Sequence, residues 1–176
     1  MADRPADSAA ENDVVSSAFD AWGPPPAFRS PTVAEAEALA AVYAEVDARL
    51  EALSSACRAC GDCCTFGPDR PVLFASSLEL AHLVAQAGAP ARDRQVQPGR
   101  PDAPWRCPYQ EGGLCMARAA RTLGCRTYFC DGAARRRGEA LYAEVAARIR
   151  RLVADSRRPW WYGPARQYLA GVPPRA

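Results

Sequence analysis

The sequence predicts a small, mainly α-helical domain with irregular, cysteine-rich loops. Three segments repeat apolar residues at the spacing of an amphipathic helix, and stretches rich in proline and glycine separate them. Eight cysteines gather in two of the intervening stretches. Because the bulky apolar residues are confined to a few short segments, we expect a modest hydrophobic core within the 176 residues, and loops that need another source of stability.

Composition divides the chain into a leader and one domain. Residues 1–31 are rich in Ala, Asp, Ser and Pro, which predicts a mostly disordered leader that docks late, if it docks. Residues 32–176 are predicted to form the helical domain, with its cysteine core at residues 57–131.

The first helix is predicted from Thr32 to about Ser55, because Thr32 and Glu35 form a capping box at its start. Its apolar face is Leu39, Val42, Tyr43, Val46, Leu50 and Leu53. It leads directly into the first cysteine group.

Residues 71–74 fit a short strand or an extended arm, and residues 88–104 read as a loop. Between them, Ser76 and Glu79 form a second capping box, and Gly88 is placed to end that helix. A last helix is predicted from the apolar residues Leu141, Val145, Ile149, Leu152 and Val153. We expect the aromatic residues that follow to pack it back over the cysteine loops: Trp160, Trp161 and Tyr162.

Charge and hydropathy exclude several classes of partner. All 22 basic residues are arginine, but the net charge of +2 argues against a nucleic-acid-binding surface. No apolar run is long enough to cross a membrane, and the acidic start does not resemble a secretory signal, so we expect a cytoplasmic protein without a membrane partner. In that reducing compartment, cysteines serve more often as metal ligands or redox thiols than as structural disulfides.

The cysteines form two groups of four. A CxxC step lets two sulfurs converge on one ion at the ~2.3 Å bond length of zinc, and CxxCxxC is also how ferredoxins begin an iron-sulfur site whose distant cysteine precedes proline, as Cys107 precedes Pro108. We therefore predict that all eight cysteines are metal ligands, in one or two sites that hold zinc or an iron-sulfur cluster. The residues are Cys57, Cys60, Cys63, Cys64, Cys107, Cys115, Cys125 and Cys130.

Two alternatives stay open at this point: disulfide pairing, and burial of single cysteines as small apolar residues. Cys63 and Cys64 favour two sites or one buried thiol, because neighbouring side chains of an extended backbone point in opposite directions. The single histidine, His82, is expected to be structural. No phosphate-binding glycine loop and no nucleophile with a nearby base is recognisable, so no catalytic residue is predicted.

The segments CRACGDCC and RCPYQEGGLCMARAARTLGCRTYFCD resemble the YkgJ-type cysteine cluster family, which is described as a zinc- or iron-chelating domain and as iron-sulfur cluster containing. Cys115 begins the family's last stretch, Arg121 takes the place of its arginine, Cys125 with Arg126 supplies its CR pair, and Cys130 closes it. The chain departs from that pattern at Ala117, Arg118 and Thr122. The resemblance covers residues 57–131 and implies metal binding without assigning an activity.

The sequence thus predicts a zinc- or iron-chelating protein that carries an iron-sulfur cluster or a zinc site made of four cysteines. The alternatives are a structural zinc module that mediates protein interaction, and an accessory or catalytic protein for protein modification. Arg126, next to Cys125, is predicted to bind the cofactor by donating hydrogen bonds to its sulfurs, although a solvated arginine fits equally well. Expected partners are the metal ion and a protein, with no nucleic acid and no membrane.

Overall fold

A computed structural model of the chain describes residues 22–51, 60–67, 70, 72–91, 94, 96 and 104–174. The described residues are mainly helical, with several very short strands, so the predicted helical character is confirmed in this coarse form. The helices are α2 (Val33–Glu51), α3 (Ser77–Ala87), α4 (Leu123–Thr127), α5 (Gly132–Asp155) and α6 (Ala165–Ala170), with single 3-10 turns η1 (Asp62–Cys64) and η3 (Arg118–Ala120).

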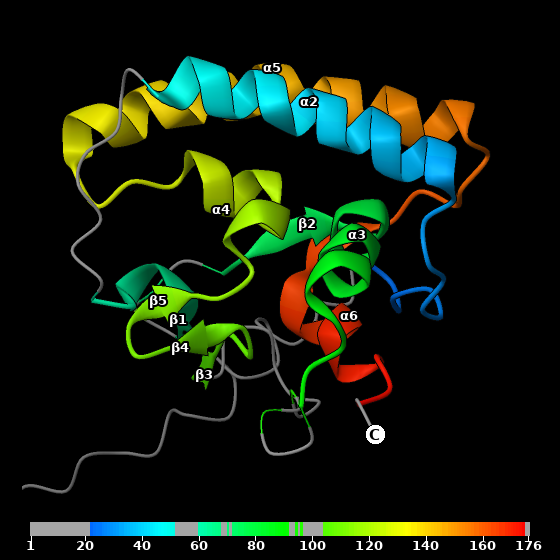
Figure 1. Ribbon diagram of the computed structural model, residues 1–176, viewed down its shortest axis with the longest axis horizontal. Helices are drawn as coiled ribbons and strands as arrows, with labels where there is room; N and C mark the ends of the chain where they lie inside the picture. The colour runs from blue at the N-terminus through cyan, green and yellow to red at the C-terminus, as the bar shows by residue number, and fades with distance from the viewer. Residues whose placement is uncertain are drawn as a thin grey trace, which may run out of the picture.

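The strands form three antiparallel pairs within this part of the chain. They are β1 (Thr65–Phe66) with β3 (Trp105–Arg106), β2 (Phe74–Ser76) with β6 (Tyr162–Pro164), and β4 (Gln110–Glu111) with β5 (Leu114–Cys115). In Figure 1, α2 and α5 lie along one side of the molecule with α4 beneath them, α3 and α6 gather beside the β2–β6 pair, and the other two strand pairs lie together at one end. That end carries most of the cysteines that the structure describes.

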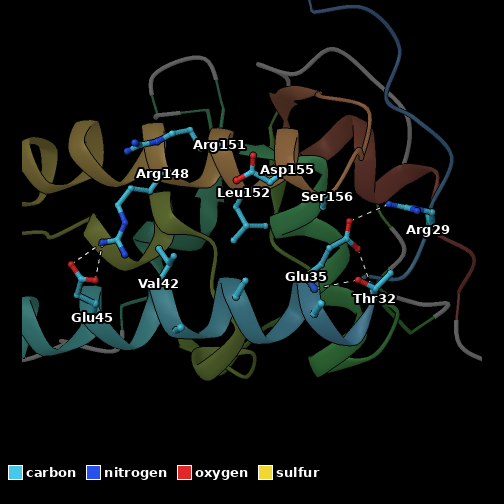
Figure 2. A pocket seen from close by; sticks show the side chains of 13 residues that line it. Arg29, Thr32, Glu35, Val42, Glu45, Arg148, Arg151, Leu152, Asp155 and Ser156 are labelled. Carbon is cyan, nitrogen blue, oxygen red and sulfur yellow. Dashed lines mark hydrogen bonds and ion pairs between the residues drawn. The ribbon is translucent and has the colours of Figure 1, made fainter.

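Helices α2 and α5 run antiparallel along their whole length (Figure 1). The seam between them is apolar, and the exposed flanks carry two cross-helix ion pairs, Arg49 with Glu144 at 2.7 Å and Arg148 with Glu45 at 2.8 Å. The predicted apolar faces meet here in one buried cluster that includes Leu39, Val42, Val46, Leu50, Leu141, Val145, Ile149 and Val153. A shallow hollow of about 880 Å³ opens between the two helices near the start of α2; it is lined by Glu45, Arg148 and Leu152 among others and contains no cysteine (Figure 2).

Both predicted capping boxes are confirmed. The Thr32 amide donates to the Glu35 carboxylate at 2.8 Å, and the Glu35 amide donates to Thr32 Oγ1 at 3.2 Å. Ser76 and Glu79 form the same reciprocal pair at the start of α3, which ends at Gly88 with φ 79°. The predicted end of the first helix at Ser55 and most of the predicted 88–104 loop lie outside the described residues.

Part of the predicted leader, residues 22–31, lies within the described part of the chain. Residues 22–31 pack on the domain: the Trp161 indole N–H donates to the Gly23 carbonyl at 3.4 Å, and the Trp22 ring meets the Phe74 ring edge-on at 5.1 Å. Phe28 packs against the core cluster formed by α3 and α6. The sequence left docking of this leader open, and Trp22 and Phe28 are the aromatic residues through which residues 22–31 contact the domain. Residues 1–21 lie outside the described part of the chain.

The Glu79 carboxylate joins three helices in the interior, where its side chain is buried. It accepts hydrogen bonds from the Ser76 amide at 2.9 Å, from the Leu123 amide at the start of α4 at 2.9 Å, and from the Tyr43 hydroxyl of α2 at 3.2 Å. Because a buried carboxylate is costly unless it is hydrogen-bonded, these bonds fix α4 relative to α2 and α3.

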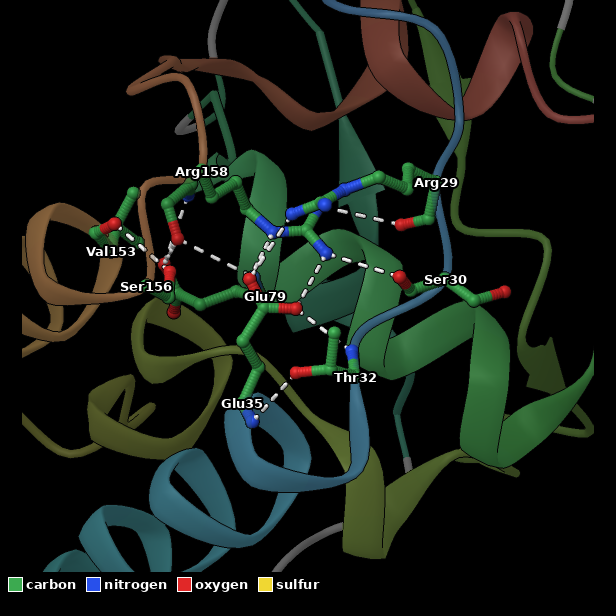
Figure 3. Close-up of polar contacts among 9 residues, drawn as sticks. Arg29, Ser30, Thr32, Glu35, Glu79, Val153, Ser156 and Arg158 are labelled. Carbon is green, nitrogen blue, oxygen red and sulfur yellow. Dashed lines mark hydrogen bonds and ion pairs between the residues drawn. The ribbon is translucent and has the colours of Figure 1, made fainter.

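A second buried carboxylate, Glu35, anchors the docked segment to the end of α5 (Figure 3). Arg158 Nε and Nη2 each donate to Glu35 at 3.0 Å, and the same guanidinium donates to the carbonyls of Arg29 and Ser30. The hydrogen bonds from Arg158 lower the pKa of Glu35 to about 2.

We predict that Glu35→Gln lowers the free energy of unfolding at pH 7 by about 3 kcal/mol, because it leaves the Arg158 cation buried without its partner. Glu35 has a lower pKa in the folded state than in the unfolded state, so its contribution is complete above the ordinary carboxyl pKa and is lost as the pH falls toward about 2. Chemical denaturation across that range measures the effect. Glu37→Gln, at an exposed position of α2, is the control. A wild type and Glu35→Gln variant of equal stability at pH 7 would contradict the prediction.

Candidate metal centre

Short backbone pairings bring Cys64, Cys107 and Cys115 to one place. Thr65 pairs with Arg106 in the β1–β3 ladder, and the Cys107 amide donates to the Cys64 carbonyl at 2.8 Å. The Gln110 amide donates to the Cys107 carbonyl at 3.0 Å, and Gln110 pairs with Cys115 across the β4–β5 hairpin. Cysteines from distant parts of the sequence therefore meet at one end of the molecule.

The turn η1 places Cys63 beside Cys64. It begins after Gly61, whose φ of 73° suits glycine, and the Cys64 amide donates to the Gly61 carbonyl at 3.0 Å. The two sulfurs lie 3.8 Å apart. The expectation that these side chains diverge assumed an extended backbone, whereas a 3-10 turn lets neighbouring side chains approach the same point. Of the two alternatives for this pair, one buried thiol agrees with the burial of Cys64, and the number of metal sites stays a prediction.

Cys64 lies at the centre of a group of sulfurs. Its side chain is buried, and hydrogen bonds with the sulfurs of Cys107, Cys115 and Cys63 raise the pKa of Cys64. The hydrogen bond from Cys64 lowers the pKa of Cys63 to about 6, and that of Cys115 also to about 6. Because Cys64 has one proton to donate, the group favours a thiolate at either Cys63 or Cys115 in neutral solution.

Cys125 extends this group from α4. Burial raises the pKa of Cys125 to about 12, and the nearby sulfurs of Cys107 and Cys115 add to the increase. The Leu123 amide, two residues before Cys125, donates to Glu79 and so fixes the start of α4. We call Cys63, Cys64, Cys107, Cys115 and Cys125 the thiol cluster.

The remaining predicted ligands are placed differently. Cys57 lies outside the described residues. Cys60 and Cys130 are exposed, and the Cys60 thiol hydrogen-bonds to the Asp62 carboxylate, whose pKa is lowered first by Arg70 and then by this contact. The structure therefore gathers the five cysteines of the thiol cluster, of which Cys63 is exposed, as Cys60 and Cys130 are.

The predicted cofactor-binding residue, Arg126, is buried and donates to oxygen atoms. Its Nε donates to the Arg121 carbonyl at 2.8 Å, its other nitrogens donate to the Asp47 carboxylate and the Ala119 carbonyl, and its guanidinium lies 4.1 Å from the centre of the Tyr43 ring. It thus fastens the turn before α4 to α2, and the solvated alternative is wrong. Its contact with a cofactor stays a prediction.

Arg121 is the cation that acts on the cysteines. Its charge contributes to lowering the pKa values of Cys63, Cys115 and Cys125. Burial in turn lowers the pKa of Arg121, and the nearby sulfurs of Cys125 and Cys115 oppose that shift. The sequence aligned Arg121 with a family arginine but assigned it no role, since the path of the loop around η3 has no local signal.

The donor set fits a metal that prefers sulfur. Four sulfurs bound tetrahedrally to zinc at about 2.3 Å lie about 3.8 Å from one another, which is the separation of Cys63 and Cys64. Thiolates of this kind suit zinc or an iron-sulfur cluster. As the side chains stand, however, the sulfurs hydrogen-bond to one another, and within the described residues no three or more Cys, His, Asp or Glu side chains are arranged to hold an ion.

Comparison with known proteins identifies no relative of this chain. No family model matches the sequence, and neither the curated proteins nor the solved structures contain a match. Among the helices of the described ranges, none is both long and apolar enough to span a membrane.

We predict that Cys64→Ala shifts the alkylation profile of Cys63 and Cys115 in metal-free protein. Without the hydrogen bond from Cys64, both pKa values rise from about 6 toward the ordinary thiol range, so thiolate reactivity appears at higher pH. The measurement is the rate of iodoacetamide labelling against pH, with each cysteine followed by peptide mass spectrometry.

Cys64→Ser is the matched control because its hydroxyl keeps a donor at the same position. Its alkylation profile is expected to lie between those of the wild type and Cys64→Ala. An alkylation midpoint that stays near pH 6 in Cys64→Ala would show that Cys64 does not set these pKa values.

Proposed function

We propose that the protein is a zinc- or iron-chelating protein whose metal centre is built on the thiol cluster. The observation that carries the proposal is the meeting of Cys64 with Cys63, Cys107 and Cys115, through backbone pairing and sulfur contacts, from three segments of chain. The resemblance of these segments to YkgJ-type cysteine cluster proteins supports the same proposal.

Electrostatics also supports metal binding at neutral pH. Metal ligation requires thiolates, and metal affinity falls when protons must be displaced. The pKa values of Cys63 and Cys115, each lowered to about 6 by the hydrogen bond from Cys64, favour a thiolate at one of these two sulfurs near pH 7, because Cys64 has a single proton to donate. Arg121 supplies a compensating positive charge beside them. A cytoplasmic location forms part of the proposal, because a reducing compartment keeps such thiols available.

The centre would add stability where the fold has least regular structure. The strands around the cysteines are two residues long, and each forms only one two-stranded pair. Structural zinc sites in small peptides contribute about 10–16 kcal/mol to folding. Bound zinc would supply a cross-link between η1 and the β3–β5 segment, and an iron-sulfur cluster would supply one-electron transfer as well.

A structural zinc module that mediates protein interaction is the second candidate. Leu114 and Met116 flank Cys115 at the β4–β5 hairpin, and their exposed fractions are 50% and 63%. Exposed apolar residues beside a metal-ordered hairpin are suited to contact with a partner protein. No residue among those described supplies a specific argument for catalysis, so a role in protein modification stays a prediction from the sequence.

Anaerobic purification followed by elemental analysis and an absorption spectrum tests the proposal. Zinc predicts a colourless protein, and an iron-sulfur cluster predicts visible absorption that dithionite bleaches. We predict that Cys107→Ser and Cys115→Ser each lose most of the bound metal, because each removes a thiolate from the shared group.

Met116→Ser is the matched control for disturbance of the hairpin, since Met116 is exposed next to Cys115. It should keep the wild-type metal content. Full metal stoichiometry in both cysteine variants would remove the thiol cluster as the binding site.

A further inference from the structure

A small cavity opens directly beside the thiol cluster. Its volume is about 270 Å³, and Cys63 and Cys125 form part of its wall. The rest of the wall comes from β1, the segment leading into β2, α4, α5 and β6. These residues are Phe66, Val72, Leu73, Phe74, Gly124, Tyr128, Tyr142 and Tyr162. None of the residues that line it is Arg, His, Asp or Glu, so apart from the Cys63 sulfur the wall has no side chain that would carry a charge opposite a charged ligand.

One side of the cavity is a preformed aromatic surface. The rings of Phe74 and Tyr162 stack across the β2–β6 pair with centroids 5.9 Å apart and planes 23° apart. Trp22, from the docked segment, meets Phe74 edge-on at 5.1 Å and holds that ring from outside the strand pair. Such a surface suits another aromatic ring, because ring pairs gain energy beyond the burial of their area.

Besides its thiols and the Tyr128 side chain, the wall of the cavity contains a pair of hydrogen-bonded tyrosines. The hydroxyls of Tyr142 and Tyr162 hydrogen-bond to each other. Burial raises the pKa of both tyrosines, so both stay protonated at neutral pH. A pair of phenol hydroxyls has two protons and uses one in the mutual bond, so the second can be donated to an oxygen of a ligand.

The size of the cavity limits the ligand. A dry apolar cavity of about 150 Å³ holds benzene, whereas sites for drug-sized molecules begin at about 300 Å³. A volume of about 270 Å³ therefore fits a single ring with a small substituent.

We propose that this cavity binds a small uncharged aromatic molecule with one hydroxyl group, of the phenol class. Its ring lies against Phe74 and Tyr162, its hydroxyl meets the Tyr142–Tyr162 pair, and its edge lies next to Cys63 and Cys125. This site goes beyond the proposed metal centre. Its aromatic wall and hydroxyl pair come from β2, α5 and β6, so they need no metal, although the bound molecule lies beside the place where the metal would be held.

Calorimetric titration with phenol tests the site, and toluene is the matched ligand because it has nearly the same shape and lacks the hydroxyl. The protein is the full chain as purified, with its metal content measured on the same sample. For a ligand of this size we expect saturable phenol binding with a Kd of about 1 mM or tighter. Absence of saturable binding up to about ten times that concentration would overturn the proposal.

Val72→Trp places a larger side chain in the cavity from a half-buried position and is expected to weaken phenol binding at least about tenfold. Val33→Trp, at a position on α2 that is 75% exposed, is the control and should bind as the wild type does. Wild-type affinity in a folded Val72→Trp variant would overturn the proposal.

The double variant Tyr142→Phe with Tyr162→Phe tests the hydroxyl pair without filling the cavity, because either hydroxyl alone still has a proton to donate to the ligand. Loss of one hydrogen bond to the ligand should weaken phenol binding about fivefold and leave toluene binding unchanged. An equal loss for both ligands, or none for phenol, contradicts the assigned orientation. The metal measurement separates the two hypotheses. Protein that contains metal but does not bind phenol would contradict only the phenol site. Protein that lacks metal but binds phenol would support the phenol site and contradict only the metal centre.

Discussion

The position of Cys64 is the constraint on which the candidate site depends. Its backbone carbonyl accepts the hydrogen bond that joins η1 to the β3 segment, and its sulfur contacts those of Cys63, Cys107 and Cys115. One residue therefore fixes both the path of two loops and the protonation of their thiols. Without that meeting point, the short strands around it would have little to keep them in register, since isolated two-stranded pairs are marginal in water.

The rest of the fold holds this meeting point against the helices. Glu79 belongs to the capping box of α3. Its carboxylate also accepts hydrogen bonds from the Leu123 amide at the start of α4 and from the Tyr43 hydroxyl of α2. Arg126 ties the preceding turn to α2 through Asp47. These buried polar contacts set the direction of α4 and so place Cys125 near the other cysteines of the thiol cluster. Helix packing and the geometry of the thiol cluster are thus linked through α4.

Local signals in the sequence predict the regular elements well. The Ser76–Glu79 and Thr32–Glu35 pairs identify helix starts because each satisfies its own backbone donors within one turn. The start of α5 is harder to predict, since its first turns lack an apolar face. Asp131 is the available signal, because its carboxylate accepts from the Ala134 amide at 2.8 Å.

The candidate site is predictable only as a set of residue types. The grouping of Cys64 with Cys107 depends on strands of two residues, too short to leave a periodic pattern. The influence of Arg121 and the pairing of Tyr142 with Tyr162 depend on loops and on β6, which meet only after the helices have packed. Propensity and spacing describe neighbours along the chain, whereas these contacts join residues that are distant in sequence.

X-ray absorption spectroscopy at the metal edge of anaerobically purified protein tests the central claim most directly, because it reports which atoms surround the metal. The account predicts a coordination shell made of sulfur, with about four scatterers at about 2.3 Å if the metal is zinc. A shell dominated by nitrogen or oxygen, or a metal signal unchanged when Cys107 and Cys115 are both replaced, would contradict it.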